Sequence, residues 1–157
     1  MIFHPKILLD TNIVVDYLNE RDPFFDKACL LMLCTKLGEF ESWITSSQAT
    51  DIVYISSNGS ESSTLITDVL YQFRSLRQFI EVHPTTVDEV DAMLQTTWND
   101  PEDYLLYTSA KNIGADCIIS RDSKDFEQSA DIPVFDCDGF FDWLEREHGL
   151  VYDEIPI

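Results

Sequence analysis

Residues 6–18 have the sequence KILLDTNIVVDYL, in which an apolar run is followed at once by polar residues and then by a second apolar pattern. Residues 6–9 predict a short buried strand, because the apolar side chains do not alternate with polar ones. The apolar residues of 13–18 recur at helical spacing, so a helix is expected directly after residues 10–12. The chain therefore opens with a strand, a polar strand end and a helix.

The same alternation continues along the chain. Further strands are predicted at residues 42–45, 79–82, 117–120 and 133–135, and helices, with their caps, at residues 22–37, 46–56, 61–78, 86–97, 100–114 and 140–147. Short, continuously apolar strands separated by helices predict a mostly parallel five-stranded sheet covered on both faces, which is a three-layer α/β/α sandwich. No linker or repeat divides the chain, so residues 1–157 are expected to form a single domain.

Several helix ends carry recognisable local signals. Asp22-Pro23 and Asp100-Pro101 each place a capping residue before a proline at the first helical position. Thr86 and Glu89 have the spacing of a capping box, and Gly114 is placed to end the helix that starts at Asp100.

The composition is strongly acidic. Ten Lys and Arg against 29 Asp and Glu give a formal net charge of −19, and such a surface repels nucleic acid unless metal ions or local cations reverse the field. It attracts basic protein partners and divalent metals instead. The hydrophobic content of 45% excludes a disordered chain. With no apolar run of membrane-helix length and no leader pattern, a soluble, cytoplasmic protein is expected.

The four cysteines do not favour a zinc site or a disulfide framework. They are Cys29, Cys34, Cys117 and Cys137. The sequence contains no C-x-x-C motif, and its three histidines are far apart. Buried free thiols are the expected state.

A set of aspartates stands at predicted element ends and on helices. Asp10 and Asp122 follow predicted strands, while Asp51 and Asp103 lie on predicted helices. Each can also be explained without a functional site, as a helix cap, an acid that favours the helix dipole, a solvated residue or a turn residue. Ligands of parallel sheets, however, bind beyond the carboxyl ends of the strands, where the strand order reverses. The question is whether these acids converge there.

Convergence would require a cation, because carboxylates that share a pocket repel one another and raise one another's pKa. Mg²⁺ or Mn²⁺ relieves that repulsion, and these hard cations prefer oxygen ligands. Two such ions can generate a hydroxide and stabilise both the attacking and the leaving oxygen of a phosphodiester. The pattern therefore indicates metal-assisted phosphodiester hydrolysis.

Two motifs, in order and about ninety residues apart, resemble those of PIN-domain ribonucleases. The first is ILLDTNIVVDYL at residues 7–18, similar to the family's apolar strand, Asp, Ser/Thr, Asn and apolar helix. The second is DPEDYLLYTSAKNIGADCIISRDSKDF at residues 100–126, similar to D-x-x-D, A-x-x-x-G-A-D, a strand and T-R-[ND]-x-x-D-F. The resemblance covers nearly the whole chain.

This resemblance implies roles for individual residues. It implies the catalytic acids Asp10, Asp51, Asp103 and Asp122, of which Asp10, Asp103 and Asp122 would be ligands of Mg²⁺ or Mn²⁺. Thr11 and Asn12 would orient Asp10, and Asp125 would be a supporting acid. Asp51 is one methylene shorter than the Glu usual in the family, which leaves open whether it coordinates directly or through water.

Two neighbouring acids have different expected roles. Asp100 is expected to cap its helix, and Glu102 to point around the helix from Asp103. Neither is therefore expected to be a metal ligand.

PIN domains of this length resemble the toxin halves of VapBC toxin–antitoxin pairs. The resemblance implies an RNA substrate, inhibition by a basic antitoxin and a homodimer. Arg121 and Lys124 lie beside the predicted pocket and are the candidate substrate-binding cations. The aromatic-rich helices offer candidate interface residues, although most are expected in the core.

One alternative remains in view, and two others fail at specific residues. A catalytically inactive PIN-like module that binds protein or RNA would account for the shorter acid at Asp51 and for the high negative charge. A phospho-receiver domain needs an acceptor Asp after strand three and a Lys after strand five, where this chain has His83-Pro84 and Asp136-Cys137-Asp138. A haloacid-dehalogenase phosphatase needs D-x-D where this chain has Asp10-Thr11-Asn12.

Overall fold

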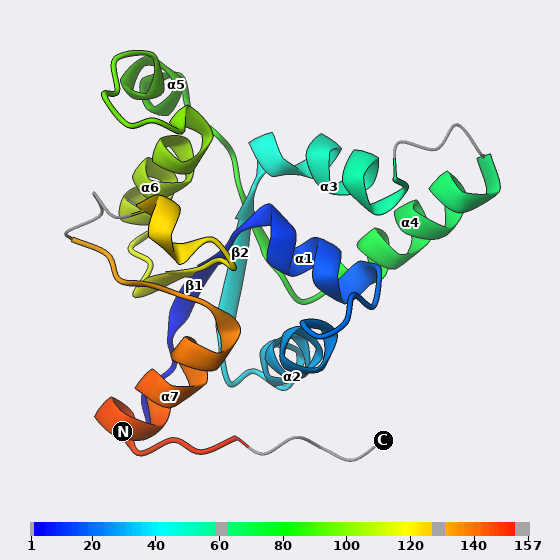
Figure 1. The fold of residues 1–157 in the computed structure, drawn as a ribbon, viewed down its shortest axis with the longest axis vertical. Coiled ribbons are helices and arrows are strands. Elements are labelled where there is room, and N and C mark those ends of the chain that lie inside the picture. Colours follow the sequence, from blue (N-terminus) through cyan, green and yellow to red (C-terminus); the bar gives the residue numbers. More distant parts are fainter. Residues whose placement is uncertain (1, 59–62, 127–130, 153–157) are drawn as a thin grey trace.

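The computed structural model describes residues 2–58, 63–126 and 131–152. The strands are β1 (Lys6–Leu9), β2 (Glu41–Thr45), β3 (Glu81–His83), β4 (Cys117–Ile119) and β5 (Val134–Phe135). The helices are α1 (Thr11–Leu18), α2 (Phe25–Lys36), α3 (Ala49–Ser56), α4 (Ser63–Leu76), α5 (Val87–Leu94), α6 (Pro101–Ile113) and α7 (Cys137–His148), with short 3-10 helices η1 (Ser46–Gln48) and η2 (Ser123–Phe126). The strand and helix alternation predicted from the sequence is confirmed (Figure 1).

All five strands are parallel, in the order β3-β2-β1-β4-β5. The chain starts at the central strand β1, moves through β2 to β3 on one side, and then crosses to β4 and β5 on the other. In register, Leu8 of β1 lies opposite Trp43 of β2 and Ile118 of β4. The strand order therefore reverses between β1 and β4, which is where a ligand site is expected in such a sheet.

The central strand supplies side chains to a core on each face of the sheet. Ile7 and Leu9 pack in the larger core, together with residues of α1, α2 and α7. Leu8 points the other way and packs in the smaller core with Leu106 of α6 and Ile118 of β4. Because a strand turns successive side chains to opposite faces, three consecutive apolar residues fill both cores. The predicted three-layer arrangement is thus confirmed.

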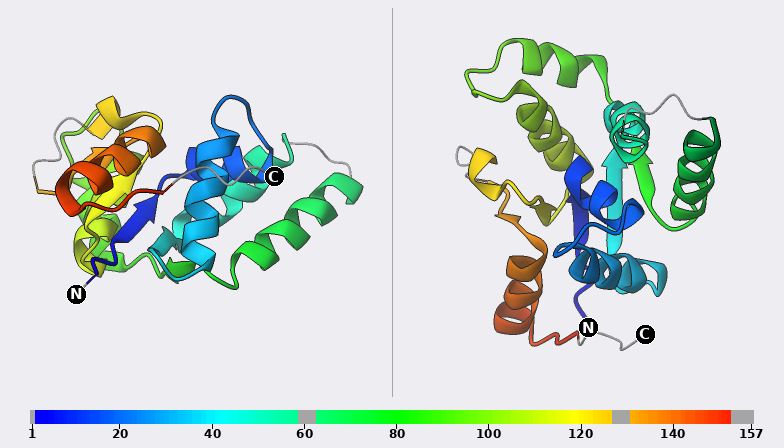
Figure 2. Two further views of the ribbon diagram at one scale, coloured as in Figure 1. Left: turned by 90° about the horizontal axis from the view of Figure 1, so that it is seen from below. Right: turned by 45° about the vertical axis from the view of Figure 1, so that its right-hand side comes forward.

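Two helix pairs extend the layers. The helices α3 and α4 lie side by side and project away from the sheet (Figures 1 and 2). On the other side of the molecule, α5 packs on α6, which covers the smaller core. The first turns of α3 and α6 lie at the same end of the sheet as the carboxyl end of β1 (Figure 1).

Some helix ends were predicted correctly and others were not. Asp100 caps α6, and Gly114 ends it at φ 70°, a left-handed conformation that favours glycine. The prediction that α2 starts at Asp22-Pro23 is wrong: α2 starts at Phe25, after a turn that contains both residues. The helix α7 starts at Cys137 rather than at Phe140, because Asp136 accepts the backbone N–H of Gly139 at 2.7 Å and caps it.

The cysteines are free thiols, as predicted. Burial raises the pKa of the Cys34 thiol to about 11 and that of Cys137 to about 12, so both are protonated at neutral pH. Within the described ranges, every helix is too short or too polar to cross a membrane.

A buried carboxylate, Glu89, ties α5 to β3 and α6. Its oxygens accept the Thr86 N–H at 2.8 Å and the Asn112 side-chain N–H at 3.0 Å, and they lie 2.9 and 3.0 Å from His83 Nε2. Burial alone would raise the pKa of Glu89, but these hydrogen bonds outweigh it and hold the pKa below its usual value. The charged carboxylate therefore stabilises the folded protein.

We predict that Glu89→Gln lowers the free energy of unfolding by about 1–3 kcal/mol, because buried donors lose a charged acceptor. A lowered folded-state pKa gives stability that is present above the unfolded-state pKa of about 4.3 and is lost as the pH falls through the folded-state value. The difference between wild type and variant in urea denaturation should therefore shrink below about pH 4. A variant at an exposed acid, Glu145→Gln, should change little; an equal loss in both variants would contradict the account.

Candidate active site

The site lies at the carboxyl ends of β1 and β4, where the strand order reverses. Asp10 follows β1 directly, and Ser120, Arg121 and Asp122 follow β4. The Asp10 backbone N–H donates to the Ile119 carbonyl at 2.9 Å, so the two strand ends are fixed side by side. The sheet thus brings residues about 110 positions apart in sequence into contact.

Hydrogen bonds to both oxygens hold the Asp10 carboxylate in place. Its Oδ1 accepts the Thr11 backbone N–H at 2.7 Å, which caps α1. Its Oδ2 accepts the Ser120 hydroxyl, also at 2.7 Å. The side chain is therefore oriented from both strand ends before any ligand binds.

The surroundings of Asp10 disfavour the ionised form of its carboxyl group. Burial is the largest cause that raises its pKa above the usual value, and the negative charges of Asp122 and Asp100 raise it further. The two hydrogen bonds from Ser120 and Thr11 lower the pKa, but they do not cancel these effects. A cation beside Asp10 would compensate these effects, so the carboxylate is suited to be a metal ligand.

Asp122 is held by Asn12. Asn12 Nδ2 donates to Asp122 Oδ2 at 3.2 Å, and Asn12 Oδ1 accepts the Arg121 backbone N–H at 3.4 Å. The expectation that Asn12 orients Asp10 is therefore replaced by a role for Asn12 at Asp122. Ser120 Oγ links the two acids, because it also accepts the Asp122 backbone N–H at 3.1 Å.

The first turn of α6 adds acids to the same site. Asp100 caps the helix by accepting the backbone N–H groups of Glu102 and Asp103, as predicted. Burial, followed by the charges of Asp51, Asp10 and Asp100, raises the pKa of the Glu102 carboxyl. Glu102 therefore lies close enough to these acids to feel their charges, although its side chain is exposed.

The remaining predicted acids lie on the elements expected for them. Asp103 is buried on the first turn of α6, at 8% exposure. Asp51 is exposed on the first turn of α3, close enough to act on Glu102. The backbone of Asp125 lies in η2, but its side chain falls outside the described part of the structure.

Gln48 fixes the position of α3 relative to the site. Its Oε1 accepts the Thr45 backbone N–H at 2.7 Å, and its Nε2 donates to the Leu9 carbonyl at 2.9 Å and to Thr11 Oγ1 at 3.3 Å. One buried amide thus joins the ends of β1 and β2. The Thr11 side chain contacts Gln48, and it is the Thr11 backbone that orients Asp10.

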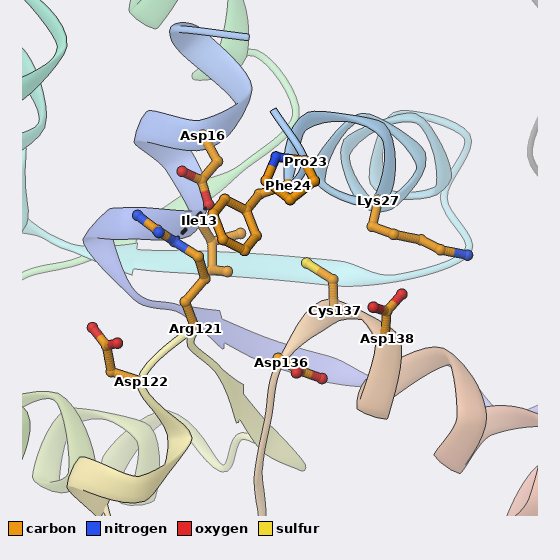
Figure 3. A pocket seen from close by; sticks show the side chains of 10 residues that line it. All are labelled: Ile13, Asp16, Pro23, Phe24, Lys27, Arg121, Asp122, Asp136, Cys137 and Asp138. Atoms are coloured by element: carbon orange, nitrogen blue, oxygen red, sulfur yellow. Dashed lines mark ion pairs between the residues drawn. The ribbon is translucent and has the colours of Figure 1, made fainter. Parts of the chain in front are cut away.

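The two predicted substrate-binding cations follow β4 in the chain. Lys124 is exposed in η2. Arg121 is partly exposed and lines a cavity of about 220 Å³ whose wall also includes Asp122 (Figure 3). The cavity therefore opens next to the carboxylates.

The chemistry of the side chains suits a hard divalent cation. The potential ligands are carboxylates, the type that Mg²⁺ and Mn²⁺ prefer, and the opposed charge on Asp10 favours a cation there. Within residues 2–58, 63–126 and 131–152, however, no group of three or more His, Cys, Asp or Glu side chains stands ready to hold a metal ion. Asp10 and Asp103 are buried, whereas Asp122 and Glu102 are exposed.

Sequence reasoning missed three residues of the site. Ser120 bonds Asp10, Gln48 joins the strand ends, and Glu102 lies close to the other acids. Only Ser120 could have been chosen from the sequence, because it is a polar residue at the end of an apolar strand, as Asp10 is. The roles of Gln48 and Glu102 depend on contacts between elements, which no local pattern reveals.

Three solved structures have a fold similar to that of this chain. VapBC2 from Rickettsia felis, bound to a promoter DNA fragment, is 17% identical with a TM-score of 0.59, over 82% of this chain and 96% of that chain. FitAcB from Neisseria gonorrhoeae is 15% identical with a TM-score of 0.62, over 83% and 97%. FitAB bound to the IR36 DNA fragment is 16% identical with a TM-score of 0.62, over 83% and 94%.

Sequence comparison is more selective. No curated protein sequence gives a significant match to the chain. A family model does match residues 6–124, which span β1 to η2 and include the carboxylates at both strand ends. The chain therefore belongs to the PIN domain family.

Proposed function

We propose that this protein is a metal-dependent endoribonuclease, and that it is the toxin of a toxin–antitoxin pair. The observation that carries the proposal is Asp10: a buried carboxylate, held at both oxygens at the point where strand order reverses, whose charge its neighbours oppose. Such an arrangement costs folding stability unless a cation compensates it. PIN domains are generally nucleases that use divalent metal, and this chain belongs to that family.

The proposed metal ligands are Asp10, Asp103 and Asp122. Asp51 and Glu102 are further acids of the proposed site. Bound Mg²⁺ or Mn²⁺ would supply an activated water and neutralise charge on the phosphodiester. The chain's own contribution is orientation: Ser120 and the Thr11 backbone hold Asp10, while Asn12 holds Asp122. Asp125 is a supporting acid in this proposal.

Substrate contact rests on few cations. Arg121 and Lys124 are the proposed phosphate-binding residues: both lie within two positions of Asp122 in the chain, and Arg121 lines the same cavity as Asp122. With a net charge of −19, the rest of the surface opposes binding of nucleic acid. We therefore expect a narrow choice of RNA and weak binding of unrelated polynucleotides.

The partner proposal rests on charge and on apolar surface. A basic antitoxin would gain association rate from the acidic field. Apolar side chains are exposed on the projecting α3 and α4 pair: Tyr54, Ile55, Leu65, Leu70 and Tyr71. A groove of about 680 Å³ between α2 and α4 lies beside them. Such surfaces favour a partner helix or a second copy of the chain in a homodimer.

The first prediction concerns cleavage. Asp10→Asn keeps the size of the side chain and removes a ligand charge, so cleavage of a labelled single-stranded RNA in Mn²⁺ should fall by more than about 100-fold. EDTA should abolish cleavage by the wild type. The matched control is Asp142→Asn, at an exposed acid of α7, which should cut at the wild-type rate.

The same RNA assay separates the proposal from a binding module. Cleavage by the wild type in EDTA would overturn the metal mechanism, and so would cleavage by the Asp10→Asn protein. If the wild type binds RNA but cuts none in Mg²⁺ or Mn²⁺, the inactive PIN-like module takes the place of the nuclease.

A second prediction concerns stability without metal. The folded state raises the pKa of Asp10, so it favours the neutral form, and stability is lost as the pH rises through that value. Asp10→Asn should therefore raise the metal-free melting temperature at pH 7 by about 2–4 °C, the effect of about 1 kcal/mol in a domain of this size.

Metal should reverse that order. At Mn²⁺ concentrations about 100 times its Kd, the wild type should gain about 3 kcal/mol, while Asp10→Asn gains much less. A metal-free variant that melts below the wild type, or an equal gain from Mn²⁺ in both proteins, would show that Asp10 is a structural acid. Differential scanning calorimetry in EDTA and in Mn²⁺ gives both values.

A third prediction addresses the toxin role in cells. Induced expression of the wild type in a bacterial host should arrest growth, because a free endoribonuclease depletes an essential RNA. Expression of Asp10→Asn to the same level should not. Normal growth with active wild-type enzyme in the lysate would leave the nuclease in place and remove the toxin assignment.

A further inference from the structure

The 220 Å³ cavity beside the carboxylates has a lining of mixed character. It lies between α1, the turn before α2, the end of β4 and the start of α7 (Figure 3). Asp122 belongs both to its wall and to the proposed catalytic acids. Any group held in this cavity, which we call the Arg121 cavity, therefore lies next to the position of the cleaved bond.

Arg121 is fixed in the cavity on two sides. Its Nε lies 2.9 Å from Asp16 Oδ2 of α1, and its guanidinium carbon lies 4.3 Å from the centre of the Phe24 ring. Figure 3 shows the Arg121 side chain beside the Phe24 ring and reaching toward Asp16. Within the described part of the chain, no hydrogen bond occupies its two Nη groups. The remaining part of the guanidinium fork is thus available to a ligand.

Asp16 is an unusual residue for a helix core. Its side chain is 1% exposed, and neither of its carboxylate oxygens has a hydrogen-bond partner among the described residues. The contact with Arg121 is an ion pair without the alignment of a hydrogen bond. Burial raises the pKa of Asp16 and the charges of Arg121 and Arg21 offset this only in part, so the buried acid costs stability that an apolar residue of similar size would not. Its value to the protein therefore lies in what it does to Arg121.

The lining combines cations, carboxylates and an aromatic ring. Arg121 and Lys27, two of the ten Lys and Arg residues of the chain, line the cavity. Four aspartates line it as well, Asp16, Asp122, Asp136 and Asp138; their carboxylates are hydrogen-bond acceptors, and Asp136 Oδ1 already accepts the Gly139 backbone N–H. A ribonucleotide carries both kinds of group, an anionic phosphate and the donating 2′-hydroxyl and base N–H groups. Phe24 is 41% exposed, and the part of its ring that Arg121 does not cover offers a surface on which a base stacks.

We propose that the Arg121 cavity binds the ribonucleotide next to the cleaved bond, with Arg121 on its phosphate, and that Asp16 is the positioning residue that holds Arg121 for this contact. The substrate part of this proposal rests on the proposed ribonuclease function. The role of Asp16 is specific: it restrains Nε, while Phe24 restrains the plane of the guanidinium.

Binding of RNA in EDTA tests the cavity without requiring cleavage. The probe is a short, fluorescein-labelled single-stranded RNA, and fluorescence anisotropy gives its Kd at several salt concentrations. Arg121→Met should weaken binding about tenfold, the loss of one charge-assisted contact. It should also reduce the slope of log K against log salt by about 0.7, the value for one phosphate of a single strand. Arg146→Met, at an exposed arginine of α7, is the matched control and should change neither.

The positioning role has its own readout. Asp16→Asn should weaken RNA binding less than Arg121→Met does, and the double variant should bind no more weakly than Arg121→Met alone, because Asp16 acts only through Arg121. Independent, additive losses would overturn the role of Asp16. Phe24→Leu, which leaves the buried ion pair in place, tests the stacking surface in a protein whose melting temperature should stay close to that of the wild type.

A cleavage assay locates the contact of Arg121 relative to the cleaved bond. In Mn²⁺, a neutral methylphosphonate placed one linkage from the cut should raise KM for the wild type, and Arg121→Met should be insensitive to that replacement. If Arg121→Met matches the wild type in Kd, salt slope and phosphate sensitivity, the cavity proposal fails while the nuclease stands. If the wild type cuts no RNA but the salt slope still falls in Arg121→Met, RNA binding by the cavity stands and the nuclease proposal fails.

Discussion

The crowding of negative charge around Asp10 is the constraint on which the rest of the site depends. The sheet topology brings the ends of β1 and β4 together, and the two residues at those ends, Asp10 and Ser120, are joined by a short hydrogen bond. Burial and the charges of Asp122 and Asp100 then oppose the ionised form of Asp10. The fold therefore holds the Asp10 carboxylate where its ionised form is disfavoured without a cation, and a bound cation would be stabilised by that charge.

The acidic composition of the chain also affects how the site would bind nucleic acid. An acidic surface weakens general binding of nucleic acid, so the few cations near the site gain importance. Arg121 is the one whose geometry is most restrained, by the buried Asp16 and by the ring of Phe24. A restrained arginine loses less side-chain entropy when it binds a phosphate, which favours selective contact over general attraction.

Local sequence patterns predicted the parts of the structure that local physics controls. The strand, Asp10 and α1 follow from residues 6–18, and the start of α6 follows from Asp100-Pro101. The start of α7 was misplaced because the glycine in its first turn concealed the cap at Asp136. The α2 start was misplaced because Asp22-Pro23 forms a turn that has the composition of a cap.

The candidate site was predictable as a set of acids but not as a set of contacts. The aspartates could be chosen because they stand at strand ends or in a recognised motif. The pairing of Asn12 with Asp122, the approach of Glu102 to the other acids and the ion pair of Asp16 with Arg121 arise only when separate elements meet. Asp16 in particular lies in the apolar pattern of α1, where nothing in the sequence distinguishes it from a solvent-facing residue.

The most direct test of the central claim is to locate Mn²⁺ in a crystal by its anomalous scattering. The account predicts a peak bound to the Asp10 carboxylate, with Asp122 or an acid of the first turn of α6 turned toward it, and loss of that peak in Asp10→Asn crystals. A crystal of the wild type in saturating Mn²⁺ with no peak at Asp10, or with a peak that persists in Asp10→Asn, would contradict it.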